Sequence, residues 1–276
     1  MKIQTAKDVE MKKELSLPEI KPIVFEILCH FKRFCLENNI KFFLSNGTLL
    51  GAVKYGGFIP WDDDIDVFVP RDDYNKLIEI YKNSEKYKLF SSERNEDFRF
   101  TFAKLCDMTT VKEEINVDNG VTLGLDIDIF PLDCCTEHIL KKSVSTRIKI
   151  NLVGCMLSKM ESAKGKGFLK GVIIRYCRMR GYDHFSKKLK KIIEKEGKRG
   201  NTHKGCLMWQ IYGNREVIPA HVFDETVTVN FEGEEFPAPK GYDTYLRSLY
   251  GEYEKDPPKE KQKTHHNYKG YRIKSV

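Results

Sequence analysis

The sequence lacks any run of about 18 apolar residues, the length that a helix needs to cross a bilayer. Its first twenty residues contain no apolar stretch of signal-peptide length. Its eight cysteines form no Cys-x-x-Cys pair and no regular framework of spacings. We therefore expect a cytoplasmic protein with reduced, buried thiols that neither spans a membrane nor is exported by a standard signal peptide.

The composition is that of a folded globular protein, with 276 residues of which 41% are hydrophobic and 12% aromatic. This length allows one large or two modest domains, and either can bury a substantial core. The net charge of +7 is unevenly distributed, because residues 141–204 hold 19 Lys and Arg but only 4 Asp and Glu. This basic segment is a clue to function.

Strand-like and helix-like patterns alternate before residue 141, which predicts an α+β fold with a mixed sheet flanked by helices. The basic segment predicts a helical insertion. The expected parts are a core over 1–140, the insertion over 141–204, a return to the core over 205–255 and a frayed polar tail over 256–276. The expected helices cover 18–38, 48–54, 74–82 (capped by Asp72 or Asp73) and 242–250, and the expected strands cover 42–44, 67–69, 87–90, 99–106, 126–130 and 226–229.

Aspartates at positions 62, 63, 64 and 66 lead directly into a strand that Pro70 ends. Alternate side chains of a strand share a face, so Asp64 and Asp66 should project together while Ile65 and Val67 enter the core. Carboxylates this close need a cation or protons to neutralise them, and carboxylate oxygens suit Mg²⁺ or Mn²⁺. The pattern predicts a metal site on Asp64 and Asp66.

A second strand repeats the arrangement with Asp126 and Asp128, which alternate with isoleucines before Pro131. If the two strands are neighbours, their carboxylates converge on a site for phosphoryl or nucleotidyl transfer. Asp133 is a further candidate, but it follows Pro131, so Asp126 and Asp128 are favoured and Asp128 is the preferred third carboxylate. The turn at Gly47, at the start of the 48–54 helix, would receive the phosphate.

An inert, solvated turn is the alternative interpretation of the acidic cluster. It fits poorly with aspartates that continue into a hydrophobic strand. A calcium loop of the EF-hand type is excluded, because with Asp62 as first ligand the sixth position is Val67 and the twelfth is Asp73, where Gly and Glu are required.

Three segments of the sequence resemble the LicD family. They are FFLSNGTLLGAV at 42–53 with GFIPWDDDIDV at 57–67, DIDIFPLD at 126–133, and PKGYD at 239–243 with the following Leu246, YGEY at 250–253 and Pro257. The similarity covers about residues 20 to 266 and is weakest across the basic segment. It implies a nucleotidyltransferase-like fold, distantly related to DNA polymerase beta, in which 1–140 and 205–255 form the catalytic core.

The resemblance also implies transfer of phosphocholine, or a similar phospho-alcohol, from a CDP-linked donor to a sugar of a cell-surface glycan, such as a teichoic acid or lipopolysaccharide precursor. Fukutin and fukutin-related protein, which belong to the same superfamily, transfer ribitol phosphate, so the motif does not fix the alcohol. By position, Asp64, Asp66 and Asp128 would hold the metal, with Asp126 as the other candidate. Gly47 and Thr48 would form the phosphate turn.

Several cations and aromatic side chains could contact such a donor, although each also has an ordinary structural role. Of the aromatics, Trp61 is favoured as a contact for a quaternary ammonium. The candidates for the diphosphate are Lys54, Arg71, Arg99 and Lys104, and the aromatic candidates are Tyr55, Phe58, Trp61, Trp209 and Tyr212.

The basic segment 141–204 suits an anionic membrane surface or a phosphate-bearing, lipid-linked glycan acceptor. Nucleic acid would satisfy the charge equally well, but we favour the glycan precursor at the inner face of the membrane. Two other functions stay open. One is a nucleotidyltransferase that uses a nucleoside triphosphate on a small molecule or RNA, and the other is an inactive binding protein of the same fold, against which the intact aspartates argue.

Overall fold

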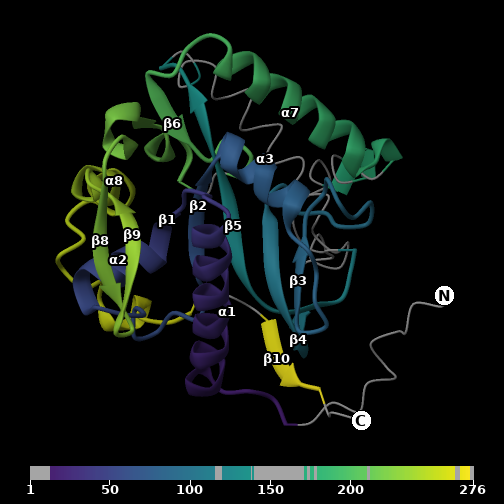
Figure 1. Ribbon diagram of the computed structural model, residues 1–276, viewed down its shortest axis with the longest axis vertical. Helices are drawn as coiled ribbons and strands as arrows, with labels where there is room; N and C mark the ends of the chain where they lie inside the picture. Colours follow the sequence, from purple (N-terminus) through teal and green to yellow (C-terminus); the bar gives the residue numbers. More distant parts are fainter. Residues whose placement is uncertain are drawn as a thin grey trace.

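The computed structural model describes residues 13–115, 120–137, 139, 171–172, 175–176, 179–209, 212–264 and 268–273. They form a mixed α+β fold around an eight-stranded sheet (Figure 1). Helices α1 (Leu17–Glu37) and α3 (Arg71–Ile80) lie against the same face of this sheet and contact β5. Among the described residues no helix has both the length and the apolar character to cross a membrane.

Helix α1 confirms the predicted 18–38 helix to within one residue. Ser16 and Glu19 form a capping box, in which the Ser16 backbone N–H donates to Glu19 Oε2 at 2.8 Å. Ile27, Leu28 and Phe31 are completely buried, because they form the apolar stripe that faces the sheet.

The main path of the sheet runs β1–β2–β5–β4–β10, and only the β2–β5 pair is parallel among the pairings of the described strands. Strand β3 extends the sheet beside β4, and β6 joins the end of β5 to β7. The bounds are β1 (Phe43–Leu44), β2 (Asp66–Pro70), β3 (Tyr87–Phe90), β4 (Ala103–Glu114), β5 (Leu123–Cys135), β6 (His203–Gly205), β7 (Ile218–Pro219) and β10 (Tyr268–Arg272).

Strand β5 does not end at Pro131, as the sequence predicted, but continues to Cys135. The Asp128 N–H donates to Ile65 O, just before β2, so N–H groups of even-numbered residues point toward β2 and the nitrogen of Pro131 points toward the other neighbouring strand. That neighbour, β4, begins at Ala103 opposite Ile129, so no ladder hydrogen bond is lost at the proline. Asp133 therefore lies inside the strand, on the face opposite to Asp126 and Asp128.

Other predicted boundaries are shifted as well, among them the starts of α2 at Asn46 and β5 at Leu123. Helix α3 begins at Arg71, so Asp72 and Asp73 lie in its first turn and Pro70 occupies the cap position. Strand β4 starts four residues later than expected and extends to Glu114, since β10 pairs with its second half from Thr110 to Glu114.

The C-terminal part contains a hairpin of β8 (Thr226–Phe231) and β9 (Glu234–Pro239), followed by α8 (Tyr242–Tyr250) as predicted. The hairpin lies beside β1 and α2 (Asn46–Tyr55). Three short 3₁₀ helices complete the described part, η2 (Gly213–Glu216), η3 (Ala220–Phe223) and η4 (Lys259–Lys261).

The expectation of a frayed tail is wrong for residues 268–272, which form β10 at the edge of the sheet beside β4. Gly270 permits this close approach, because a Cβ atom there would lie 3.2 Å from Leu125 Cδ2. Pairing also satisfies the backbone groups of β4 from Thr110 to Glu114, which would otherwise form an open edge.

In the basic segment, α7 (Tyr182–Gly197) confirms helical structure over its own length. Phe185, Leu189 and Ile193 form its buried stripe, and the helix contacts β5. Most of residues 141–181 lies outside the described residues. The expected boundary at residue 204 falls inside β6, which pairs with the end of β5.

Candidate active site

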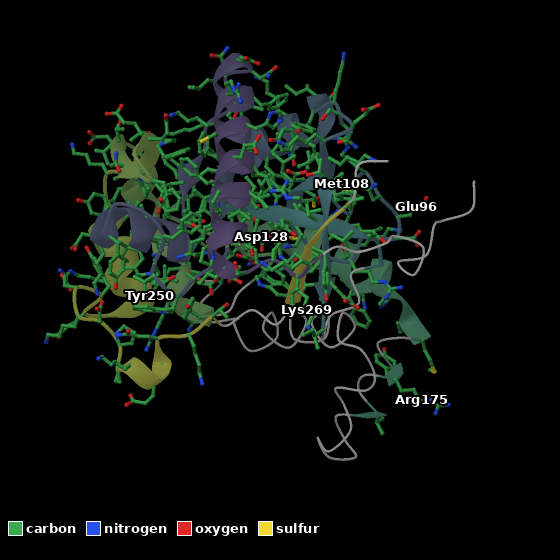
Figure 2. The ribbon with its side chains drawn as sticks, turned by 90° about the horizontal axis from the view of Figure 1, so that it is seen from below. Glu96, Met108, Asp128, Arg175, Tyr250 and Lys269 are labelled. Atoms are coloured by element: carbon green, nitrogen blue, oxygen red, sulfur yellow. The ribbon has the colours of Figure 1, made fainter. Side chains whose placement is uncertain are left out.

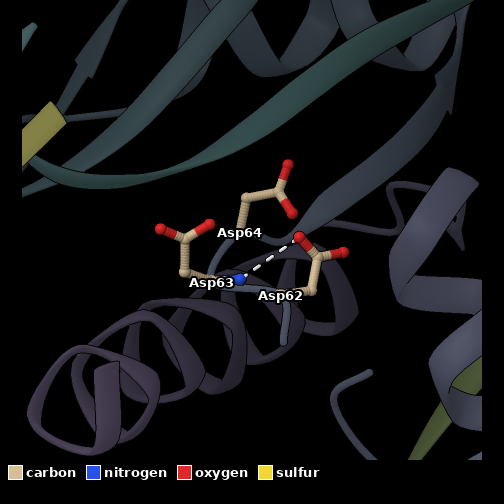
Figure 3. A group of neighbouring side chains, drawn as sticks. All are labelled: Asp62, Asp63 and Asp64. Atoms are coloured by element: carbon tan, nitrogen blue, oxygen red, sulfur yellow. Dashed lines mark hydrogen bonds between the residues drawn. The ribbon is translucent and has the colours of Figure 1, made fainter. Parts of the chain in front are cut away.

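An acidic loop precedes β2 and contains three carboxylates close together (Figure 3). Asp62, Asp63 and Asp64 each offer an oxygen, and these oxygens lie within 4.8 Å of one another. The backbone N–H of Asp63 donates to Asp62 Oδ1 at 3.2 Å, which helps to fold the loop. Oxygen ligands of this kind fit a hard divalent cation.

The next carboxylate, Asp66, is the first residue of β2 and is buried. It is the register partner of Asp128 in β5, and Asp128 is in turn the partner of Lys104 in β4. Register partners point to the same side of a sheet, so these three side chains form one charged row across three strands. Ile127 and Ile129 alternate with Asp128 and are completely buried, which confirms one carboxylate face and one core face.

Two lysines hold the carboxylates of β5. Lys104 Nζ donates to Asp126 Oδ1 at 3.0 Å and also to Asp128 Oδ1. Lys112 Nζ donates to the same Asp126 oxygen at 3.2 Å. The other oxygen, Asp126 Oδ2, is buried and has no hydrogen-bond partner among the described residues.

This network separates the two aspartates electrostatically. Burial raises the pKa of Asp128 to about 6, because Lys104 offsets only part of that effect and Asp126 adds to it. Burial also acts on Asp126, but Lys104 and Lys112 together outweigh it and hold the Asp126 pKa below its usual value. Asp126 is therefore an ionised anchor for two cations, whereas Asp128 is 20% exposed at its side chain and is the more available of the two.

The N-terminus of α2 lies against the acidic loop. A Cβ atom on Gly47 would be 2.9 Å from Asp62 Oδ2, so the glycine allows the helix and the loop to meet. Thr48 Oγ1 accepts the Asp66 N–H at 2.8 Å, and the Ser45 N–H donates to Asp66 O at 3.1 Å. The structure thus brings the predicted turn residues Gly47 and Thr48 together with the aspartates.

Neighbouring elements hold the chain that leads into this loop. Glu232, from the turn between β8 and β9, accepts the Phe58 N–H at 2.9 Å through Oε1. Lys21 of α1 donates to Ile59 O at 3.2 Å and to Pro60 O at 3.1 Å. Thr264 Oγ1 donates to Asp63 Oδ1 at 2.9 Å, so the C-terminal segment also contacts the loop.

The four cations predicted to contact the diphosphate lie in different parts of the structure. Lys104 lies in the charged row, but it is buried and bonded to carboxylates. Lys54 lies near the C-terminal end of α2, where it pairs with Asp256 at 2.5 Å and donates to Tyr253 O. Arg71 forms a two-bond ion pair with Asp133, at 2.7 and 3.0 Å, on the opposite face of β5, and Arg99 lies beside Gly120.

Among the aromatic candidates, Phe58 and Trp209 have structural partners. The Phe58 ring lies 4.9 Å from that of Phe231, and the Trp209 ring lies 5.5 Å from that of Phe102. Trp61 is half-buried, with its ring 6.3 Å from that of Tyr55.

Tyr212 is 42% exposed and contacts Tyr250 of α8, with their rings 5.5 Å apart. Burial raises the pKa of Tyr212, and the negative charges of Glu216, Asp66 and Asp62 raise it further. Burial raises the pKa of Tyr250, and Asp66 adds to this. The negative charge of the acidic site thus acts on both tyrosines of this aromatic pair, and Figure 2 labels Tyr250.

Sequence reasoning did not identify Lys112, Glu232, Tyr250 or Thr264 as neighbours of the site. Each comes from an element far along the chain from residues 62–66, so no local pattern could reveal the contact. Asp62 and Asp63 belonged to the recognised acidic cluster but were not singled out as site residues.

This mixed α+β chain, with its acidic loop beside a charged row of side chains, belongs to the LicD family. The family described as LicD/FKTN/FKRP, nucleotidyltransferase domain, matches residues 39–149, which include the acidic loop, β2, β4 and β5. The chain is similar along most of its length to the lipopolysaccharide cholinephosphotransferase LicD of Haemophilus influenzae, with 30% identity over 275 residues, covering 94% of this chain and 99% of the relative.

Shorter similarities extend to two uncharacterized proteins. One is from Rickettsia prowazekii, with 39% identity over 75 residues that cover 27% of this chain and 26% of the relative. The other is from Rickettsia typhi, with 40% identity over 65 residues that cover 24% of this chain and 19% of the relative.

Proposed function

We propose that the protein transfers phosphocholine, or a similar phospho-alcohol, from a CDP-linked donor to a sugar of a glycan precursor and releases CMP. The observation that carries this proposal is the charged row of Asp66, Asp128 and Lys104 beside the acidic loop and the N-terminus of α2. The name of the Haemophilus influenzae relative supports phosphocholine as the transferred group.

Mg²⁺ or Mn²⁺ fits the donor set of this site, since the acidic loop gathers three carboxylate oxygens within 4.8 Å. Asp64, which belongs to this cluster, and Asp66, at the start of β2, are the proposed ligands, and Asp128, the register partner of Asp66, is the proposed third. When bound, the ion supplies positive charge for the donor diphosphate and for the departing CMP.

The protein's own groups then have distinct tasks. The first turn of α2, in which Gly47 lies next to Asp62, has backbone N–H groups at Gly47 and Thr48 that are the proposed donors to a phosphate. Asp128 accepts the proton of the acceptor hydroxyl as that oxygen attacks the phosphorus bearing the alcohol. Asp126 contributes indirectly, because it fixes Lys104, which in turn fixes Asp128.

A quaternary ammonium requires aromatic faces or carboxylates around it. Tyr212 with Tyr250, on which the charge of Asp66 acts, is one aromatic group with this chemistry, and Trp61, next to the acidic loop, is the other. We propose that the alcohol of the donor lies against one of these two aromatic groups, and that the acceptor is an anionic or lipid-linked glycan at the inner face of the membrane.

The decisive measurement is CMP release from CDP-choline with a glycan acceptor, in the presence of Mg²⁺ or of a chelator. Wild type, Asp66→Asn and Asp224→Asn should be compared, because Asp224 is an exposed aspartate outside the site. CDP-ribitol, CDP-glycerol and CTP serve as parallel donors. Metal-dependent CMP release that Asp66→Asn abolishes and Asp224→Asn retains is the expected result.

Other outcomes identify the two alternatives. Consumption of CTP with release of pyrophosphate, and no turnover of the CDP-alcohols, would reassign the protein to nucleotide addition. Absence of turnover with all donors and acceptors would favour an inactive binding protein of the same fold.

A further inference from the structure

An exposed apolar stripe precedes α7. The described positions 171–172, 175–176 and 179–180 are helical, and Val172, Tyr176 and Met179 are 47%, 45% and 74% exposed. Their spacing of four and three residues places them on one helical face, within an arc of about 60°. Arg175 and Arg180 flank this face on its two sides.

This stripe is tied to α7 at its start. The Tyr176 ring lies 6.5 Å from the Phe185 ring, and the Arg180 guanidinium lies 5.7 Å from the centre of the Tyr176 ring. Figure 2 shows Arg175 on a segment that projects from the body of the molecule, well away from Asp128 in that view.

Helix α7 continues the positive charge. Its buried stripe of Phe185, Leu189 and Ile193 fixes which side faces the sheet. The opposite side carries five exposed lysines, with Glu194 as the exposed acidic residue among them. These lysines fall within an arc of about 100° and are Lys187, Lys188, Lys191 and Lys195 of α7 with Lys198 at its C-terminal cap.

We propose that this region of the chain, the apolar stripe followed along the sequence by the lysine face of α7, binds an anionic lipid bilayer. Exposed aliphatic side chains next to several cations are what an interfacial helix presents to lipid, with the apolar groups inserted and the cations near the head groups. Charge complementarity selects an anionic surface. Nucleic acid would use the lysines but would leave Val172 and Met179 in water, so it explains only half of the surface.

The proposal goes beyond transferase activity and does not depend on it, because vesicle binding requires no turnover. The full chain is mixed with sedimentable vesicles of phosphatidylglycerol and phosphatidylethanolamine, or of phosphatidylcholine alone, at low and high salt. We expect binding to the anionic vesicles that weakens with salt, and much weaker binding to phosphatidylcholine.

Two triple variants test the two halves of the surface. Val172→Ser with Tyr176→Ser and Met179→Ser removes the apolar stripe, and Lys188→Gln with Lys191→Gln and Lys195→Gln removes three charges. Each should weaken partitioning by at least about tenfold, since each lysine near a charged surface contributes about 1 kcal/mol.

Matched controls lie elsewhere on the molecule. Lys259→Gln with Lys261→Gln and Lys263→Gln removes the same charge from the exposed region around η4, and Leu36→Ser removes an exposed aliphatic side chain from α1. Both should bind like wild type.

Four results would each overturn the proposal. They are failure of wild type to bind anionic vesicles, equal binding to phosphatidylcholine, equal losses in the controls, and unchanged binding in either triple variant. Circular dichroism of each variant establishes that a loss of binding is not a loss of folding.

Discussion

Asp66 and Asp128 are register partners across β2 and β5, the parallel pair of the sheet. Neighbouring strands lie about 4.8 Å apart, so the two carboxylates start from adjacent points on one face. Lys104 is the partner of Asp128 on its other side and bonds to it. The charge of each member therefore depends on its neighbours, and this makes single substitutions in the row informative.

Replacement by asparagine should reduce activity at Asp128 but stability at Asp126. We expect Asp128→Asn to fold normally and to lose at least about 100-fold in kcat, because it removes the proposed proton acceptor. Asp126→Asn should lower the free energy of unfolding by about 3 to 5 kcal/mol, because it leaves Lys104 and Lys112 buried with less compensation. The kinetics and the denaturant titration of both variants provide the measurement. If Asp126→Asn were stable but inactive, Asp126 instead of Asp128 would be the proton acceptor.

Metal binding should be measurable without any substrate. We expect Mg²⁺ or Mn²⁺ to raise the melting temperature of wild type in a concentration-dependent manner, since a ligand that binds only the folded state stabilises it. Asp64→Asn should weaken the affinity by more than about tenfold. Asp224→Asn is the matched control, and an equal loss in that variant would show that the ion does not bind at the acidic loop.

Gly47→Ala should separate stability from function. Alanine is favoured over glycine within a helix, so stability should be unchanged or higher by about 0.5 to 1 kcal/mol. The added methyl would lie 2.9 Å from Asp62 Oδ2 and must displace that carboxylate, so activity and metal affinity should fall. Gly171→Ala, where no atom lies within 4 Å of the added methyl, is the control. Full activity in Gly47→Ala would remove this turn from the site.

His30 should make stability depend on pH. Burial lowers its pKa, and its ring stacks on Tyr87 at 4.2 Å while Nε2 lies 3.0 Å from the Tyr81 hydroxyl. As pH falls below about 6.5, the unfolded chain gains the proton first, so the free energy of unfolding should decrease until the folded pKa is reached. Denaturant titrations between pH 8 and pH 5 should show a steeper decrease in wild type than in His30→Phe. Identical pH slopes would contradict this assignment.

Local patterns predicted the arrangement of the aspartates better than the residues that support them. The alternation of Asp126 and Asp128 with isoleucines identified the core face of β5, and Gly47 does lie next to the acidic loop, although the predicted turn is wrong in that Asn46 and Gly47 already belong to α2. These features depend on residues close in sequence, where strand parity and turn chemistry act directly.

The remaining features depend on contacts between distant segments. Pro131 indicates the end of a strand when considered alone, but β5 continues because β4 begins only at Ala103 and leaves the proline nitrogen without a partner to satisfy. A lysine is usually expected at the surface, but the side chain of Lys112 is only 10% exposed and pairs with Asp126. Residues 268–272 belong to a polar tail that was expected to be frayed, but backbone pairing with β4 requires no apolar side chains.

The edge strand β10 also joins a segment that the ribosome makes early to one that it makes late. Leu15, just before α1, donates its N–H to Gly270 O at 2.8 Å, so one end of the described fold is bonded to a residue made 255 positions later. Until the ribosome has released that stretch, the β4 edge from Thr110 to Glu114 has no strand beside it. A nascent chain therefore carries a temporary docking edge for other strands, and rapid closure by β10 protects it from association with a second unfinished copy.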